Sequence, residues 1–98
     1  MKFHQQHYLK NKTLQKEKLM TLPEAISARI KYLCRKQRIT PNKLAKWAGL
    51  EPSTITSIFY GKSKNPGIGT MMKICRGLGI TIIDFFSHES FNRENIEL

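Results

Sequence analysis

Two short helical patterns separated by three residues constrain the fold of this chain more than any other feature of its sequence. The patterns cover 41–48 and 52–60, and Gly49 follows the first of them. Ala45 is small enough for two helices to cross steeply at close range, and glycine adopts the positive φ of such a turn without steric cost. Ile55 then fills the angle between the helices. This arrangement predicts a helix-turn-helix whose second helix leaves a polar face uncovered.

Three further apolar patterns with a helical period complete a single all-α domain over residues 20–87. They predict helices at 24–37, 68–78 and 82–86, each bounded by a capping residue or by a glycine. The β-branched run 79–83 is also compatible with a short strand, although we favour a helix that begins at 82. A chain of 98 residues has room for one modest core.

Glycine is unusually frequent around the predicted helix 68–78. Gly67 and Gly69 stand at its cap and first turn, and Gly77 lies near its end, where glycine costs up to ~1 kcal/mol relative to alanine. We therefore expect this helix to begin loosely, and the loop 61–69 to be mobile until it meets phosphate.

Three large apolar side chains can serve either the core or a partner. We expect Met71 and Met72 to fill the core, because methionine adapts to irregular gaps. Trp47 is interpreted as a half-buried packing residue rather than a contact for DNA or protein.

The chain carries a strong excess of positive charge, with 17 Lys and Arg against 7 Asp and Glu. Residues 20–87 hold eleven of the basic residues and three of the acidic ones. Such a balance favours a polyanionic partner, nucleic acid before an anionic membrane. No apolar run reaches the ~18–20 residues that a membrane-spanning helix needs. The N-terminus does not look like a secretion signal either, so we expect a cytoplasmic protein.

The two ends of the chain are expected to lie outside the packed domain. Residues 1–19 lack a sustained apolar stripe and predict a basic, mobile N-terminal arm. Such an arm either reaches into a minor groove or adds only non-specific charge, and the second interpretation is the simpler one. Residues 88–98 predict a C-terminal tail. Together with the fifth helix, this tail offers an apolar dimer contact made of Ile82, Phe85, Phe86, Phe91, Ile96 and Leu98.

Little in the sequence suggests catalysis or metal binding. Cys34 and Cys75 lie within apolar patterns, which is typical of reduced core thiols, with a disulfide or a reactive thiol as the less favoured alternatives. His4, His7 and His88 lack the paired spacing of a metal site. There is no nucleophile elbow, phosphate-binding glycine loop or pair of carboxylates. We therefore expect no enzyme activity, no metal, no cofactor and no small-molecule substrate.

Four stretches of the chain resemble the phage-repressor and Cro-like (XRE-type) helix-turn-helix family, namely ITPNKLAKWAGL, STITSIFYGK, KNPGIGTMMKIC and LGITIIDFF. The likeness covers residues 24–86, about two thirds of the chain. It implies a compact five-helix lambda-repressor-like DNA-binding domain, in which the second and third helices read DNA. By position, the recognition helix is the segment 52–60.

The resemblance implies base contacts from the outer face of the recognition helix, at Ser53, Thr54, Thr56 and Ser57. Hydroxyls both donate and accept hydrogen bonds, so they discriminate bases less sharply than Arg, Asn or Gln does. Pro52 departs from family members that have a long polar side chain at this position. We therefore expect modest direct readout, supplemented by DNA shape or bridging waters.

The resemblance also implies two groups of phosphate contacts, one on either side of the recognition helix. At the start of the second helix, backbone N–H groups and the helix dipole suit an oxyanion. The loop after the recognition helix supplies the other group. The expected contacts are Thr40, Asn42, Lys43, Lys46, Tyr60, Lys62, Ser63, Lys64 and Asn65.

These features predict a sequence-specific double-stranded DNA-binding transcriptional regulator, in the first instance a repressor that binds two half-sites as a homodimer. The alternative is an antitoxin-like or adaptor module on the same fold with weak DNA binding. It stays open because the recognition helix lacks Arg, Asn and Gln. A membrane-surface role is less favoured, because the basic helices are expected to pack rather than stay freely amphipathic.

Overall fold

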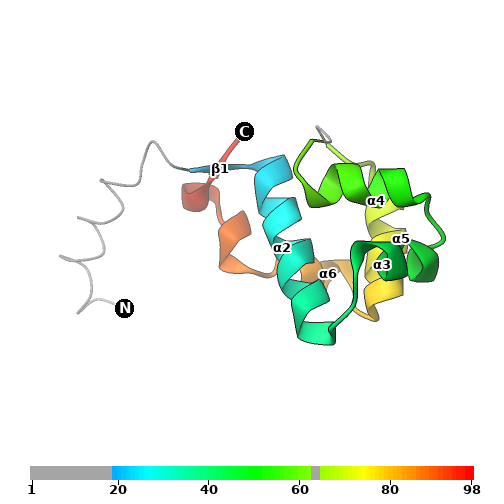
Figure 1. Ribbon diagram of the computed structural model, residues 1–98. Helices are drawn as coiled ribbons and strands as arrows, with labels where there is room; N and C mark the ends of the chain where they lie inside the picture. The colour runs from blue at the N-terminus through cyan, green and yellow to red at the C-terminus, as the bar shows by residue number, and fades with distance from the viewer. Residues whose placement is uncertain (1–18, 63–64) are drawn as a thin grey trace.

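The computed structural model describes residues 19–62 and 65–98, which contain five α-helices in the predicted order (Figure 1). The helices are α2 (Leu22–Gln37), α3 (Pro41–Ala48), α4 (Pro52–Phe59), α5 (Ile68–Leu78) and α6 (Ile82–Phe86). The last four agree with the predicted bounds to within one residue. The run 79–83 forms no strand, so the prediction of a helix that begins at residue 82 is confirmed.

The start of α2 lies two residues before the predicted position because a complete capping box places it there. The Glu24 N–H donates to the Thr21 hydroxyl oxygen at 3.3 Å, and the Thr21 N–H donates to the Glu24 carboxylate at 2.9 Å. Threonine followed three residues later by glutamate is the sequence signature of a capping box, and the helix starts directly after its cap. Leu22 is therefore the first helical residue.

The corner between α2 and α3 is repeated between α5 and α6. In each corner the residue that ends the first helix is left-handed, with φ of 58° at Arg38 and 75° at Gly79. The next residue is an isoleucine, whose N–H donates to the carbonyl oxygen of Cys34 or Cys75 at 3.0 Å. A threonine side chain then caps the following helix in both cases. The same local sequence thus sets the entry of both α3 and α6.

The core lies between the five helices, and its largest fully buried side chains are Phe85, Ile30, Leu44, Ile55, Met71 and Ile74. The tightest contact in it joins α3 to α5. A Cβ atom at Gly77 would lie 3.0 Å from the backbone nitrogen of Ala48 and 3.2 Å from its Cα. The helix-weakening glycine in α5 therefore has a packing reason, since only glycine allows the two backbones to approach this closely.

Polar side chains of α2 bind the C-terminal ends of three other helices. Ser27 donates to the last carbonyl oxygen of α4. Arg29 donates to two carbonyl oxygens in α6, at 2.9 and 3.0 Å, and Gln37 donates to the last carbonyl oxygen of α5 at 2.7 Å. These donors satisfy carbonyl groups that have no partner within their own helices.

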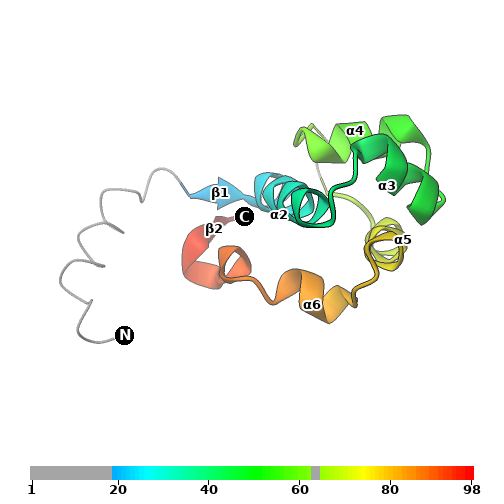
Figure 2. The same cartoon turned by 60° about the horizontal axis from the view of Figure 1, so that its bottom comes forward.

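Residues after Ser87 fold back along α2 towards the start of the domain (Figure 2). They form two 3-10 turns, η3 (Glu89–Phe91) and η4 (Arg93–Asn95), and a short strand, β2 (Ile96–Glu97). This strand pairs in parallel with β1 (Met20–Thr21). The segment that the sequence marked as a tail therefore contacts the domain at both η3 and β2.

The aromatic residues expected at a dimer surface mostly pack on one another. Phe85 is fully buried, so its assignment to that surface was wrong. Its ring lies 4.9 Å from the ring of Phe86 and 6.0 Å from that of Phe91, measured between centroids. Of the six residues expected at the contact, Leu98 is the one that is almost wholly exposed. The fifth helix also exposes Ile83, which was not predicted.

Of the three ambiguous apolar side chains, Met71 is buried in the core as expected. Trp47 is 47% exposed, so about half of its surface is accessible to a partner. Met72 is 52% exposed, so its prediction as core filler was wrong. The two methionines are adjacent on α5, and the helical period turns the second one outward.

Both cysteines are free and buried, and burial raises the pKa of the Cys34 and Cys75 thiols. At pH 8 the folded protein therefore keeps both thiols protonated, whereas the unfolded chain exposes thiols that begin to ionise there. Because the thiolate is the reactive form, we expect labelling with an aromatic disulfide reagent to be more than about tenfold slower in native protein than in denaturant. Stopped-flow absorbance measures both rates, and two rapidly reacting thiols in native protein would contradict the prediction.

Candidate nucleic-acid interface

The turn between α3 and α4 has the geometry that its sequence predicts. Gly49 has φ of 69°, and the Leu50 N–H donates to the carbonyl oxygen of Ala45 at 2.9 Å. Ala45 and Ile55 are almost fully buried between the helices. Pro52 occupies the first turn of α4, where a missing N–H costs nothing. The turn thus fixes which side of α4 is covered.

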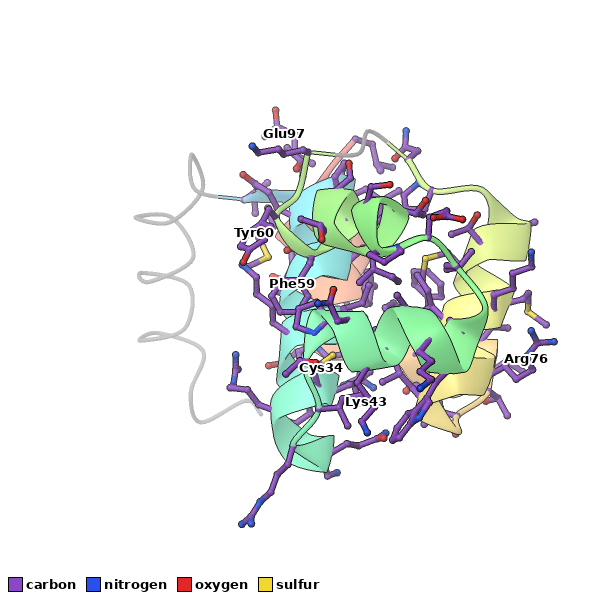
Figure 3. The ribbon with its side chains drawn as sticks, turned by 45° about the vertical axis from the view of Figure 1, so that its right-hand side comes forward. Cys34, Lys43, Phe59, Tyr60, Arg76 and Glu97 are labelled. Carbon is purple, nitrogen blue, oxygen red and sulfur yellow. The ribbon has the colours of Figure 1, made fainter. Side chains whose placement is uncertain are left out.

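The hydroxyl-bearing face of α4 stays accessible. Ser53 and Thr56 are exposed, and Thr54 and Ser57 are partly buried. All four belong to one helix, as predicted, and within residues 19–62 and 65–98 no segment fully covers them. Figure 3 shows α3 and α4 together on one side of the molecule.

Three of these hydroxyl residues line a groove of about 470 Å³ between α4 and the start of α5. The groove is formed by Ser53, Thr54, Ser57, Ile58, Asn65, Pro66, Gly67 and Thr70. Asn65, expected to contact phosphate, is therefore beside the expected base-reading residues, whereas Thr56 lies outside the groove. Sequence reasoning gave no role to Thr70. Thr70 is three residues after the Gly67 cap. Only the packing of α5 against the domain shows that Thr70 lies on the side of α5 that faces α4.

The start of α3, on one side of α4, carries polar and basic groups. Thr40 caps α3, and its hydroxyl oxygen accepts the Lys43 N–H at 3.1 Å. Asn42, Lys43 and Lys46 are exposed, and the first turn of α3 contains no acidic residue. The Lys43 ammonium also lies 5.8 Å from the ring centroid of Trp47. Cations beside a helix N-terminus give this end a positive potential.

The end of α4 presents a second basic group. Tyr60 is 60% exposed, and its ring meets that of Phe59 edge to face at 5.4 Å. Lys62 is exposed, and its N–H donates to the Ser57 carbonyl oxygen at 2.8 Å. Lys31 of α2, which sequence reasoning did not single out, holds its ammonium 5.5 and 5.6 Å from these two rings. The expected contacts Ser63 and Lys64 lie outside the described residues.

The arrangement brings together hydroxyls and cations, the groups that contact phosphate oxygens in protein–DNA complexes. No group of three or more His, Cys, Asp or Glu within residues 19–62 and 65–98 is placed to hold a metal ion. In the same part of the chain, no helix is both long and apolar enough to cross a membrane.

Comparisons with known proteins agree with this geometry. Residues 29–90 match a family model described as a Cro/C1-type HTH DNA-binding domain. Among solved structures, the chain is similar to a protein described as prophage Lp1 protein 11, with 39% sequence identity and a TM-score of 0.67. The match covers 76% of this chain and 99% of the other. No curated protein is significantly similar to the chain.

Proposed function

Because the chain belongs to the Cro/C1-type helix-turn-helix DNA-binding domain family, we propose that it is a transcriptional regulator that binds a specific double-stranded DNA sequence. One observation carries the proposal. The accessible hydroxyl face of α4 lies between two basic groups, one at the start of α3 and one at the end of α4. A helix that enters the major groove needs such phosphate contacts on both sides of it.

We further propose that the protein acts in the cytoplasm as a repressor and as a homodimer. A single α4 with hydroxyl readers covers few bases, so two copies on half-sites about one helical turn apart would supply the missing specificity. A single copy with this recognition chemistry would discriminate poorly between operator and genome.

Selection from a randomised duplex library at near-physiological salt tests the proposal. We expect an enriched motif with two-fold symmetry, and we expect the double variant Ser53→Ala, Ser57→Ala to relax the central positions of each half-site. The double variant Thr81→Ala, Ser87→Ala removes two hydroxyls from the ends of α6 and should leave the motif unchanged. Enrichment of no motif by the wild-type protein would instead support the adaptor alternative.

The Lys62→Ala variant should bind the selected motif more weakly, and the loss should depend on salt. Removing one phosphate contact lowers the slope of log affinity against log salt by about 0.9 for each bound copy. Arg76→Ala is the matched control, because Arg76 is an exposed cation in the last turn of α5, far from Tyr60 and the end of α4 (Figure 3). Fluorescence anisotropy between 50 and 300 mM salt measures both slopes. Equal slopes for the two variants would contradict a phosphate contact at Lys62.

A further inference from the structure

Three basic residues form a single row along α2. Lys31 and Arg35 are spaced at i and i+4, which places them on one side of α2, and Arg38 is the left-handed residue that directly follows the last turn of the helix. Arg35 and Arg38 are exposed, and Lys31 is partly buried where it meets α4. At 1.5 Å per residue the row is about 10 Å long. We refer to these three residues as the α2 row.

The α2 row lies on the side of α2 that borders the helix-turn-helix. Ser27, one turn before Lys31, donates to the last carbonyl oxygen of α4, and the Lys31 ammonium lies above the Phe59 and Tyr60 rings. The opposite side of α2 borders α6. There, Arg29 binds the carbonyl groups of α6.

The α2 row also connects the two basic groups of the candidate interface. Lys31 is next to Tyr60 at the end of α4, and Arg38 is two residues before the Thr40 cap of α3. In Figure 3, α2 runs behind α3 and α4 along the side where Tyr60 and Phe59 are labelled. Basic residues therefore occur in sequence order from Lys31, beside the end of the recognition helix, to Arg38, just before the start of α3.

We propose that the α2 row binds the phosphate backbone of the DNA that flanks each half-site. This inference rests on the proposed function and adds to it, because it extends the contact surface beyond the helix-turn-helix. Successive phosphates on one strand rise ~3.4 Å along the helix axis and also wind around it. The long Lys and Arg side chains of a row about 10 Å long can therefore reach two or three of them. Duplex DNA is the occupant because the row is continuous with the surface that is proposed to bind the same molecule.

Charge within α2 is consistent with this occupant. Glu24 is the only acidic residue of the helix, and its carboxylate accepts the Thr21 N–H in the capping box. It lies seven residues before Lys31, two turns away from the start of the row. A polyanion along the row therefore meets no carboxylate from α2 itself.

Varying the length of the duplex distinguishes the proposed contact with flanking DNA from recognition of the motif itself. Wild-type protein should bind the selected motif more tightly when about six base pairs are added to each end. The variant Lys31→Gln, Arg35→Gln, Arg38→Gly should lose that gain, and its salt slope should fall by up to about 2.7 for each bound copy. Between 50 and 200 mM salt, wild-type affinity for the long duplex should then decrease up to about 40-fold more than that of the variant for each bound copy. Glycine is chosen at position 38 because Gly79 occupies the equivalent left-handed position.

The matched control is Lys36→Gln, Lys73→Gln, Arg76→Gln, which removes the same charge from exposed residues outside the row. It should keep the gain from flanking DNA. The inference is overturned if the row variant keeps that gain, or if the control loses as much as the row variant does. If the row variant fails to fold by circular dichroism, Arg35→Gln alone should still lower the slope by about 0.9 for each bound copy. Failure of the wild-type protein to select any motif would instead overturn the proposed function.

Discussion

Replacing Gly77 with valine should destabilise the protein by about 3 kcal/mol, at the upper end of the range for overpacked cores. The Cβ of any larger residue would lie 3.0 Å from the Ala48 backbone nitrogen and 3.2 Å from the Trp47 carbonyl carbon. These atoms belong to the backbone of α3, so α3 must move for the side chain to fit. Since α3 supports the recognition helix, DNA affinity should fall together with the midpoint of urea unfolding.

The same substitution at Gly69 is the control for Gly77→Val. Gly69 lies in the first turn of the same helix, and a Cβ there would meet no atom within 4 Å. Valine is slightly better than glycine in a helix, so Gly69→Val should change stability by less than about 0.5 kcal/mol. Urea unfolding followed by circular dichroism compares the two variants. Equal midpoints would mean that α3 and α5 do not make the close contact described above.

The Phe85→Ala variant should lose about 3–5 kcal/mol, which is enough to unfold a marginally stable domain of this size. Phe85 is fully buried, and its ring packs against the rings of Phe86 and Phe91. The cavity left by alanine would therefore loosen α6 and the returning C-terminal segment together. Thermal denaturation of the purified variant measures the loss.

Ile83→Ala provides the matched comparison within α6. Ile83 is 77% exposed, and we expect its truncation to change stability by less than about 0.5 kcal/mol. If truncation of Ile83 were as costly as that of Phe85, Ile83 would be buried in solution, for example between two copies of the chain. A concentration-dependent melting temperature would identify that case.

Local signals in the sequence were sufficient to predict the five helices. Proline, threonine and glycine mark the ends of α3, and the apolar residues at helical spacing between them are the ones that are buried. Gly49 was expected at positive φ, and its φ is 69°. These features depend on residues close together in the chain, which is why composition and spacing reveal them.

Features that depend on distant residues could not be predicted in the same way. The return of the C-terminal segment depends on Phe91 packing against Phe85 and on the pairing of β2 with β1, more than seventy residues away. Which side chains line the groove depends on how α5 approaches α4. Thr70 therefore could not be assigned to the groove from the sequence. Lys31 was passed over for the same reason, since its neighbours Phe59 and Tyr60 come from another helix.

The hydrogen bonds from Ser27, Arg29 and Gln37 have a consequence for the order in which the domain opens. An isolated helix of eight residues does not persist in water, and α4 has eight. Because α2 supplies hydrogen-bond donors to the C-terminal ends of α4, α5 and α6, detachment of α2 would fray all three helices at once. The amide protons of α4, α5 and α6 should therefore exchange with solvent in a single cooperative step, so that the recognition helix lasts only as long as α2 stays in place.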